Sequence, residues 1–169
     1  MNIEDLTAQM EWNAATIGHI VGGVSDAQAA WKPDSTSWSM LEVVNHLYDE
    51  ERYDFRARLD VMLHRPDDPL PPFDPKGLVE AERYNEHDLG ESLRRFTDER
   101  KASIAWLRSL GSPDWNAAYR EPHRTMTAGD MLASWIAHDI LHLRQLVKLR
   151  WLLTVRELAP YRVDYAGPW

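Results

Sequence analysis

The stretch TAGDMLASWIAHDILHLRQLVKL, residues 127–149, decides the fold expected of this chain. Its apolar residues recur at steps of three and four, the spacing of one face of an α-helix. Thr127 and Asp130 form a capping-box pattern that begins this helix, and we expect the helix to continue to about Leu153. One stripe of the helix combines apolar side chains with histidines: Met131, Trp135, His138, His142, Gln145 and Leu149. A stripe of this kind faces the interior of a helical bundle.

Three further helical patterns precede this stretch, and each has a recognisable start or stop. Ser39 and Glu42 form a second capping box, and Asp88 is the N-cap of a third helix. Gly22-Gly23 ends the first helix of the chain. The three expected helices run from about Ile3 to Val21, from Ser39 to His64 and from Asp88 to Leu110.

The connections between these helices are long. Residues 65–78 contain five prolines, so this segment is a crossover rather than a tight turn, and a short helical piece is expected over 77–87. Residues 111–126 are expected to be a second irregular connection, because no β-branched alternation persists there. Four helices joined by long crossover connections predict an all-α protein, a four-helix bundle.

The composition is that of a single globular domain spanning residues 1–169, with 44% hydrophobic and 27% charged residues. A formal net charge of −8 argues against nucleic acid or an anionic membrane as the main partner. No apolar run approaches the ~20 residues that span a bilayer. The chain has no cysteine, so a metal would have to be held by histidine, carboxylate or water. The first ten residues lack the features of a signal peptide, and we expect a cytoplasmic protein.

Three histidines are the candidate metal ligands. His138 and His142 lie one above the other on one helical face, ~6 Å apart at Cβ, and can reach the same ion. His46 lies on the second helix in a comparable stripe with Glu42, Glu50 and Tyr53. If the two stripes oppose each other, three neutral imidazoles leave open positions on a divalent ion, as in catalytic sites. Zinc, nickel or ferrous iron would accept this donor set.

Neighbouring side chains could complete such a site. Glu42, Glu50, Asp139 and Gln145 could orient the ligands or act as a base, and Trp135 would form a pocket wall. Each of these residues also has an ordinary structural interpretation. The histidine pair could be a satisfied buried pair, Glu50 a solvated residue, and Asp139 a surface partner of a base such as Arg144. Four other histidines are interpreted as surface or boundary residues: His19, His64, His87 and His123.

These residues resemble a known family. The run WSMLEVVNHL, residues 38–47, followed by Glu50, resembles the second-helix signature of the DinB-like (YfiT-like) metalloproteins. Residues 127–145 resemble that family's fourth helix, and Trp31-Lys32-Pro33 also fits. The resemblance covers nearly the whole chain in order and spacing. It implies a four-helix bundle, often a homodimer, with zinc or nickel held by His46, His138 and His142.

The resemblance also implies a range of activities on a small-molecule substrate. The family includes S-transferases that use bacillithiol, a mycothiol-dependent isomerase, proteins assigned as hydrolases, and stress-associated proteins. The leading hypothesis is an S-transferase that uses a small thiol such as bacillithiol, mycothiol or glutathione, because metal coordination deprotonates a thiol. The second is a metal-dependent hydrolase, with Glu50 or Asp139 assisting. The third is a non-catalytic binding module.

Overall fold

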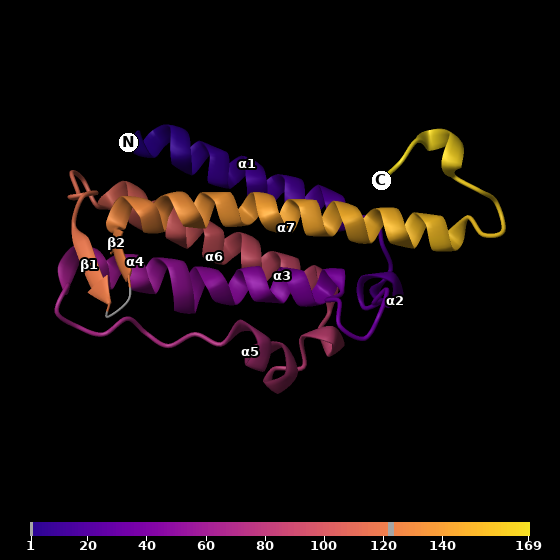
Figure 1. Cartoon of the computed structure of the whole chain (residues 1–169), viewed down its shortest axis with the longest axis horizontal. Helices are drawn as coiled ribbons and strands as arrows, with labels where there is room; N and C mark the ends of the chain where they lie inside the picture. The colour runs from indigo at the N-terminus through magenta and orange to yellow at the C-terminus, as the bar shows by residue number, and fades with distance from the viewer. Residues whose placement is uncertain (1, 122–123) are drawn as a thin grey trace.

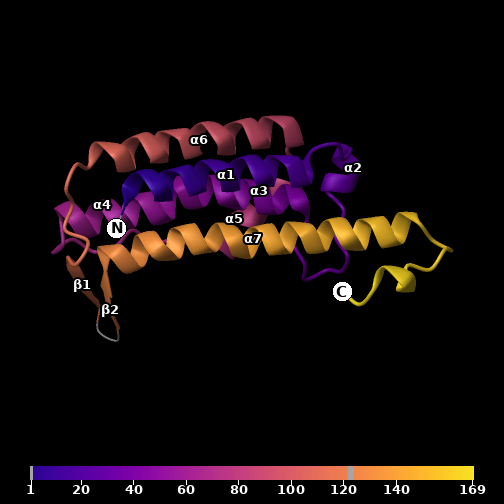
Figure 2. The same cartoon turned by 90° about the horizontal axis from the view of Figure 1, so that it is seen from above.

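The computed structural model describes residues 2–121 and 124–169. Within these residues, four long helical segments run side by side (Figure 1; Figure 2). They are α1 (Ile3–Val21), the run of α3 (Met40–Asp49), η1 (Glu50–Asp54) and α4 (Phe55–His64), then α6 (Leu89–Ser109), and finally α7 (Ala128–Glu157). The predicted four-helix bundle is confirmed, and α7 continues past the expected end at Leu153.

The helices begin where the capping residues predict. Ser39 and Glu42 form a reciprocal capping box at the start of α3, and Thr127 and Asp130 form another at the start of α7. The Asp88 side chain accepts a backbone N–H in the first turn of α6. Each of these bonds satisfies a donor that has no partner within the helix itself, which is why the sequence marks the helix starts so clearly.

The second helical segment changes its winding in the middle. Residues Glu50–Asp54 form a π-helical turn, η1, between α3 and α4. The apolar pattern predicts this segment as one uninterrupted helix, and it does not indicate the wider turn. Short π segments inside helices are frequent at functional sites, because they shift the side chains that follow relative to an α-helical register.

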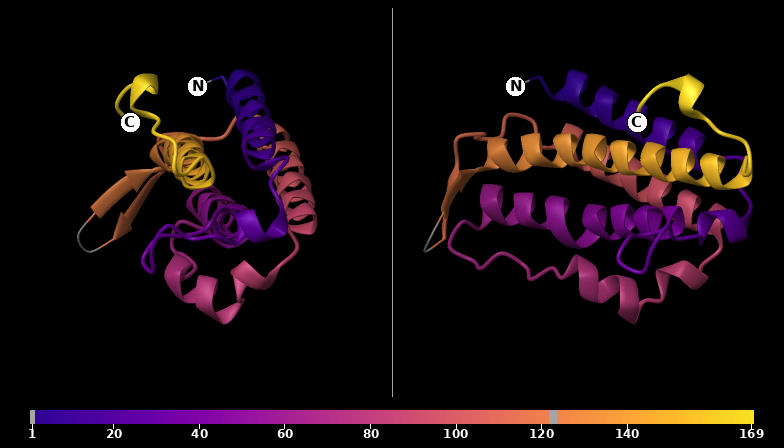
Figure 3. Two further views of the ribbon diagram at one scale, coloured as in Figure 1. Left: turned by 90° about the vertical axis from the view of Figure 1, so that its right-hand side faces the viewer. Right: turned by 45° about the vertical axis from the view of Figure 1, so that its right-hand side comes forward.

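A small hairpin replaces part of the connection expected to be irregular. Strands β1 (Ala118–Glu121) and β2 (Arg124–Thr127) pair antiparallel and project from the end of the bundle (Figure 3). The expectation of an irregular segment is therefore wrong here, since four residues per strand are too few for an alternation to be recognised. The Tyr119 hydroxyl donates to the Asp68 carbonyl (2.9 Å) and accepts from the Leu70 amide (3.1 Å). These bonds tie the hairpin to the proline-rich crossover.

The remaining elements are short: α2 (Asp26–Ala29), α5 (Pro75–Ala81), η2 (Tyr84–Glu86) and η3 (Asp164–Ala166). The α5 helix lies outside the bundle, on the side of α3 away from α1 (Figure 3). In the part of the chain that the structure describes, none of the helices is both long and apolar enough to cross a bilayer.

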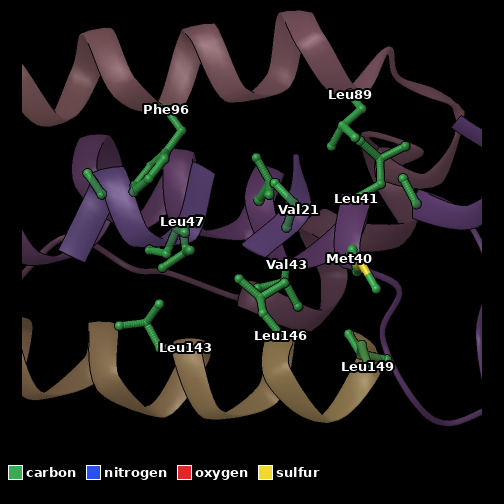
Figure 4. Close-up of a cluster of buried hydrophobic side chains, with 14 of the residues drawn as sticks. Val21, Met40, Leu41, Val43, Leu47, Leu89, Phe96, Leu143, Leu146 and Leu149 are labelled. Atoms are coloured by element: carbon green, nitrogen blue, oxygen red, sulfur yellow. The ribbon is translucent and has the colours of Figure 1, made fainter. Parts of the chain in front are cut away.

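Two clusters of buried apolar side chains fill the bundle. The first includes Val43 and Leu47 of α3, Phe96 of α6 and Leu146 of α7 (Figure 4). The second is built from Met10, Phe55, Leu59, Met62, Ile104, Leu107, Leu132, Trp135 and their neighbours. Burying these side chains supplies the main stabilisation of the fold.

Each long helical segment also carries a buried polar residue that joins one shared network, at a place in the sequence between residues of the two apolar clusters. These residues are Asn13 on α1, Glu51 on η1, Arg100 on α6 and Asp139 on α7, and we call them the buried polar layer. Arg100 donates two hydrogen bonds to Asp139 (2.7 and 2.8 Å), and its guanidinium lies 2.7 Å from Glu51. The Asn13 amide also donates to Asp139 (3.0 Å). The layer therefore connects the four segments by directional bonds.

Candidate metal centre

The structure brings His46, His138 and His142 together on the facing sides of α3 and α7. One ring nitrogen from each residue lies within 4.8 Å of the other two. The Nε2 atoms of His138 and His142 are 3.1 Å apart. The His46 ring centroid is 5.6 Å from that of His138 and 4.8 Å from that of His142. The histidine-bearing faces of the two helices oppose each other, which is the condition that the three-histidine site required.

Local packing explains why the rings converge. His46 follows the capped start of α3 by two turns, and the next residue, Leu47, is buried in the first apolar cluster. On α7, Leu143 and Leu146 pack into the same cluster. Because these apolar neighbours fix how α3 and α7 rotate toward each other, the histidine faces meet at the edge of the core.

Burial keeps the three imidazoles neutral. The pKa of His46 is lowered to about 2. Burial is the largest cause, and the neighbouring imidazoles of His142 and His138 add to it. Burial also lowers the pKa of His138 to about 4, and it lowers the pKa of His142. A neutral imidazole offers a nitrogen lone pair, which is the form that binds a metal. The three rings are therefore in the protonation state that a metal site requires.

Gln145 fixes the orientation of one ring. Its side-chain oxygen lies 2.9 Å from Nδ1 of His142. Because an amide oxygen can only accept, this contact favours the tautomer of His142 with the proton on Nδ1 and the lone pair on Nε2. This is the outer hydrogen bond that metal-binding histidines usually make. The predicted role of Gln145 in orienting a ligand is consistent with this contact.

Glu50 lies against the histidines at the start of the π-helical turn. Its Oε1 atom is 3.3 Å from Nε2 of His46, and its side chain is buried. The pKa of Glu50 is raised to about 9. Burial is the main cause, and the neighbouring Asp54 carboxylate is the second. The structure thus excludes the interpretation of Glu50 as a solvated residue. A buried carboxyl group with a raised pKa beside candidate ligands is a common feature of functional sites.

Asp139 and Trp135 lie elsewhere. Asp139 is 1% exposed and bonded to Arg100 in the buried polar layer, so its interpretation as a surface partner of Arg144 is wrong. Trp135 is also buried, stacked on Phe55 at 5.7 Å, and its indole N–H donates to Glu51. Trp135 precedes His138 by three residues and Asp139 directly follows it, and both side chains turn toward the core.

The sequence predicts surface or boundary positions for the other histidines. His19 and His64 are exposed and His87 is half-buried, which confirms the interpretation for these three. His123 lies outside the described residues. Glu42 lies in the α3 capping box and contacts Lys32 at 3.0 Å, so its side chain is used for structure.

A cavity of about 500 Å³ opens beside the histidines. It is lined by His138, Leu141, His142, Arg144, Gln145, Lys148 and Trp169. On the other side of the site, the rings of Trp38 and Phe73 lie 4.8 and 6.5 Å from that of His46. The sequence analysis missed Phe73 and Trp169, because each comes from an irregular segment whose position depends on tertiary packing.

The comparisons with known proteins agree with this architecture. A model described as the DinB superfamily matches residues 9–146. The chain belongs to the DinB superfamily. Among solved structures, this DinB protein is similar to one described as "YfiT from Bacillus subtilis is a probable metal-dependent hydrolase with an unusual four-helix bundle topology". The match has a TM-score of 0.76 and 20% identity, and covers 92% of this chain and 87% of that one. At this identity the likeness shows the fold. No curated protein matches.

Proposed function

We propose that this DinB protein is a metal-dependent hydrolase whose divalent ion is held by His46, His138 and His142. The observation that carries the proposal is the convergence of three histidine ring nitrogens within 4.8 Å, two of them from buried residues and one from the half-buried His138, with the Glu50 carboxyl group beside His46. Membership of the DinB superfamily and the likeness to YfiT, which is described as a probable metal-dependent hydrolase, support it.

The donor set fits a divalent metal. Three neutral imidazoles suit zinc, nickel or ferrous iron, and three protein ligands are the number typical of catalytic rather than structural zinc sites. The lowered pKa values of His46 and His138 remove competition from protons at neutral pH. When bound, such an ion would supply Lewis-acid chemistry, which lowers the pKa of water and polarises a carbonyl.

The residues of this chain would supply the rest of the reaction. The ionised form of the Glu50 carboxyl group would be favoured by a divalent cation bound beside it, against the burial that raises its pKa. The Glu50 carboxylate would then accept a proton from the attacking water and return it to the leaving group. Glu50 is buried, and the His46 ring beside it lies near the rings of Trp38 and Phe73, so bulk water is kept from competing for that proton. Gln145 would hold the His142 ring in the orientation that presents Nε2.

The first test measures metal in protein purified without a histidine tag or chelator. We expect about one equivalent of zinc, nickel or iron in the wild type, and loss of that metal in His46→Ala and in His142→Ala. His19→Ala is the matched control, because His19 is an exposed histidine on α1. A wild-type protein that holds no metal, and takes up none from added zinc or nickel, would refute the proposal.

The second test separates metal binding from catalysis. The metal-loaded wild type and Glu50→Gln are compared on a panel of esters and amides. We expect Glu50→Gln to keep the metal and to lose turnover by ~10²-fold or more, the usual contribution of general base catalysis. Unchanged turnover in Glu50→Gln would show that another group takes the proton.

The thiol-dependent S-transferase is the second candidate. It is favoured by the cysteine-free sequence, which requires an external thiol, and by a cavity of about 500 Å³, which has room for more than a water molecule. The sulfur of the thiolate would bond to the electrophilic carbon of a chloro-aromatic compound as chloride leaves. Metal-dependent consumption of bacillithiol, mycothiol or glutathione with such a compound, without ester or amide turnover, would favour this function over the hydrolase.

A further inference from the structure

The cavity beside the histidines has an unusual charge for this protein. The chain carries a formal net charge of −8, yet the side chains lining the cavity include Arg144 and Lys148 and no carboxylate. The two cations are four residues apart on α7, so they lie one turn apart on the same side of the helix. Among the described residues, neither has an ion-pair partner.

The same cavity has an apolar wall. Leu141 is 53% exposed and Trp169 is 63% exposed, although both are large hydrophobic side chains. The C-terminal segment folds back along α7 (Figure 1), and the Trp169 ring stacks on Trp151 with centroids 5.3 Å apart. This contact holds the indole at the cavity edge, where it offers a flat apolar surface to a ligand.

We infer that this cavity binds the substrate as an organic anion with an apolar body. The apolar part would pack on Leu141 and Trp169, and the anionic group would pair with Arg144 and Lys148. Lys148 lies six residues beyond His142, which is about 9 Å along the helix axis. The preferred ligand therefore carries its negative charge several bonds away from the group that reaches the histidines. This inference rests on the proposed function, because it assigns the cavity to the substrate of the same site.

The test compares two probes that differ in charge, 4-phenylbutyrate and 4-phenylbutan-1-ol, by isothermal titration calorimetry on the metal-loaded protein. We expect the wild type to bind the anion about fivefold more tightly, because two solvent-accessible charge contacts contribute modestly each. The double variant Arg144→Gln/Lys148→Gln should bind both probes within about twofold. Its metal content should equal that of the wild type.

The matched control is Arg94→Gln/Lys101→Gln. It also replaces one arginine and one lysine with glutamine, but at exposed positions on α6 that lie outside the cavity. We expect it to keep the wild-type preference for the anion. Equal binding of the two probes by the wild type, or a preference that survives in Arg144→Gln/Lys148→Gln, would overturn the inference.

A titration of chelator-treated protein separates the inference from the proposed function. If the carboxylate bound only to the metal, removing the metal would abolish the preference, and the inference would be wrong. If the protein held no metal and hydrolysed no substrate, but its preference for the anion still depended on Arg144 and Lys148, the proposed function would fail and the anion site would stand.

Discussion

We expect the protein to lose more stability when the cation of the buried polar layer is removed than when one of its two carboxylates is neutralised. Arg100 is 2% exposed and carries one positive charge against the two carboxylates of Glu51 and Asp139. Burial opposes its charge, but Glu51 and Asp139 more than compensate and raise the pKa of Arg100 above its usual value. The layer therefore has one cation shared by two buried anions.

Charge counting sets the magnitudes. Arg100→Met leaves two buried carboxylates without their cation, and breaking a buried pair by removing one partner costs about 3–5 kcal/mol. Asp139→Asn instead leaves the pair of Arg100 and Glu51 intact and keeps a side chain of the same shape. The asparagine oxygen can still accept one of the two hydrogen bonds from Arg100, but its NH2 group cannot accept the other. Losing one charge-assisted hydrogen bond costs about 1.5–3 kcal/mol. Arg100→Met should therefore be the more destabilising change, although each variant replaces one residue of the same network.

Urea unfolding, monitored by circular dichroism, measures the free energy of unfolding of Arg100→Met and of Asp139→Asn. Glu51→Gln gives a second variant that keeps one ion pair, and it should resemble Asp139→Asn even if Arg100→Met fails to fold. Arg94→Met, an exposed change on the same helix as Arg100, is the control and should lie within about 0.5 kcal/mol of the wild type. If Arg100→Met were no more destabilising than Asp139→Asn, the shared-cation account of the layer would be refuted.

Two further predictions concern the helix starts. Ser39→Ala should lower the free energy of unfolding by about 1–2 kcal/mol in urea titrations, because it removes the α3 cap and a hydroxyl that donates to Asn85; no measurable loss would contradict the cap. Asp130→Ala should lower the melting temperature at pH 7. Hydrogen bonds from Thr127 lower the pKa of Asp130, so its contribution is present above the unfolded-state pKa and is lost as the pH falls. The difference in melting temperature should therefore shrink below about pH 4, and a constant difference down to pH 2.5 would be the contrary result.

The helices and the opposed histidines could be predicted because their signals are local. The capping boxes at Ser39 and Thr127 are complete within four residues, and the stripe of His138 and His142 is read from one helix. Only the pairing with His46 needed a second helix, and a bundle offers few ways to place two partly apolar stripes. For this reason the sequence predicts the cluster without knowledge of the topology.

The environment of Asp139 and Arg100 could not be predicted in the same way. Arg100 stands in a strongly charged stretch of α6, RRFTDERK, in which several charged neighbours are exposed. A polar residue within an apolar stripe of α7 can face either a pocket or a partner on another helix, and the choice depends on a contact 39 residues away in the chain. The hairpin and the position of Trp169 depend on long-range packing in the same way.

The order of residues on the two histidine-bearing segments links the buried polar layer to the candidate metal centre. On one segment Glu50 faces His46 while the next residue, Glu51, joins the layer; on α7 His138 faces the site while the next residue, Asp139, joins the layer. Adjacent residues point in different directions, about 100° apart on the α-helix α7 and by a smaller angle in the wider π-helical turn, so each segment presents one side chain to each place. Because Glu51 and Asp139 bind the same guanidinium, neither segment can rotate without breaking a buried ion pair. The layer therefore holds the two histidine faces in the opposition that the proposed metal site requires.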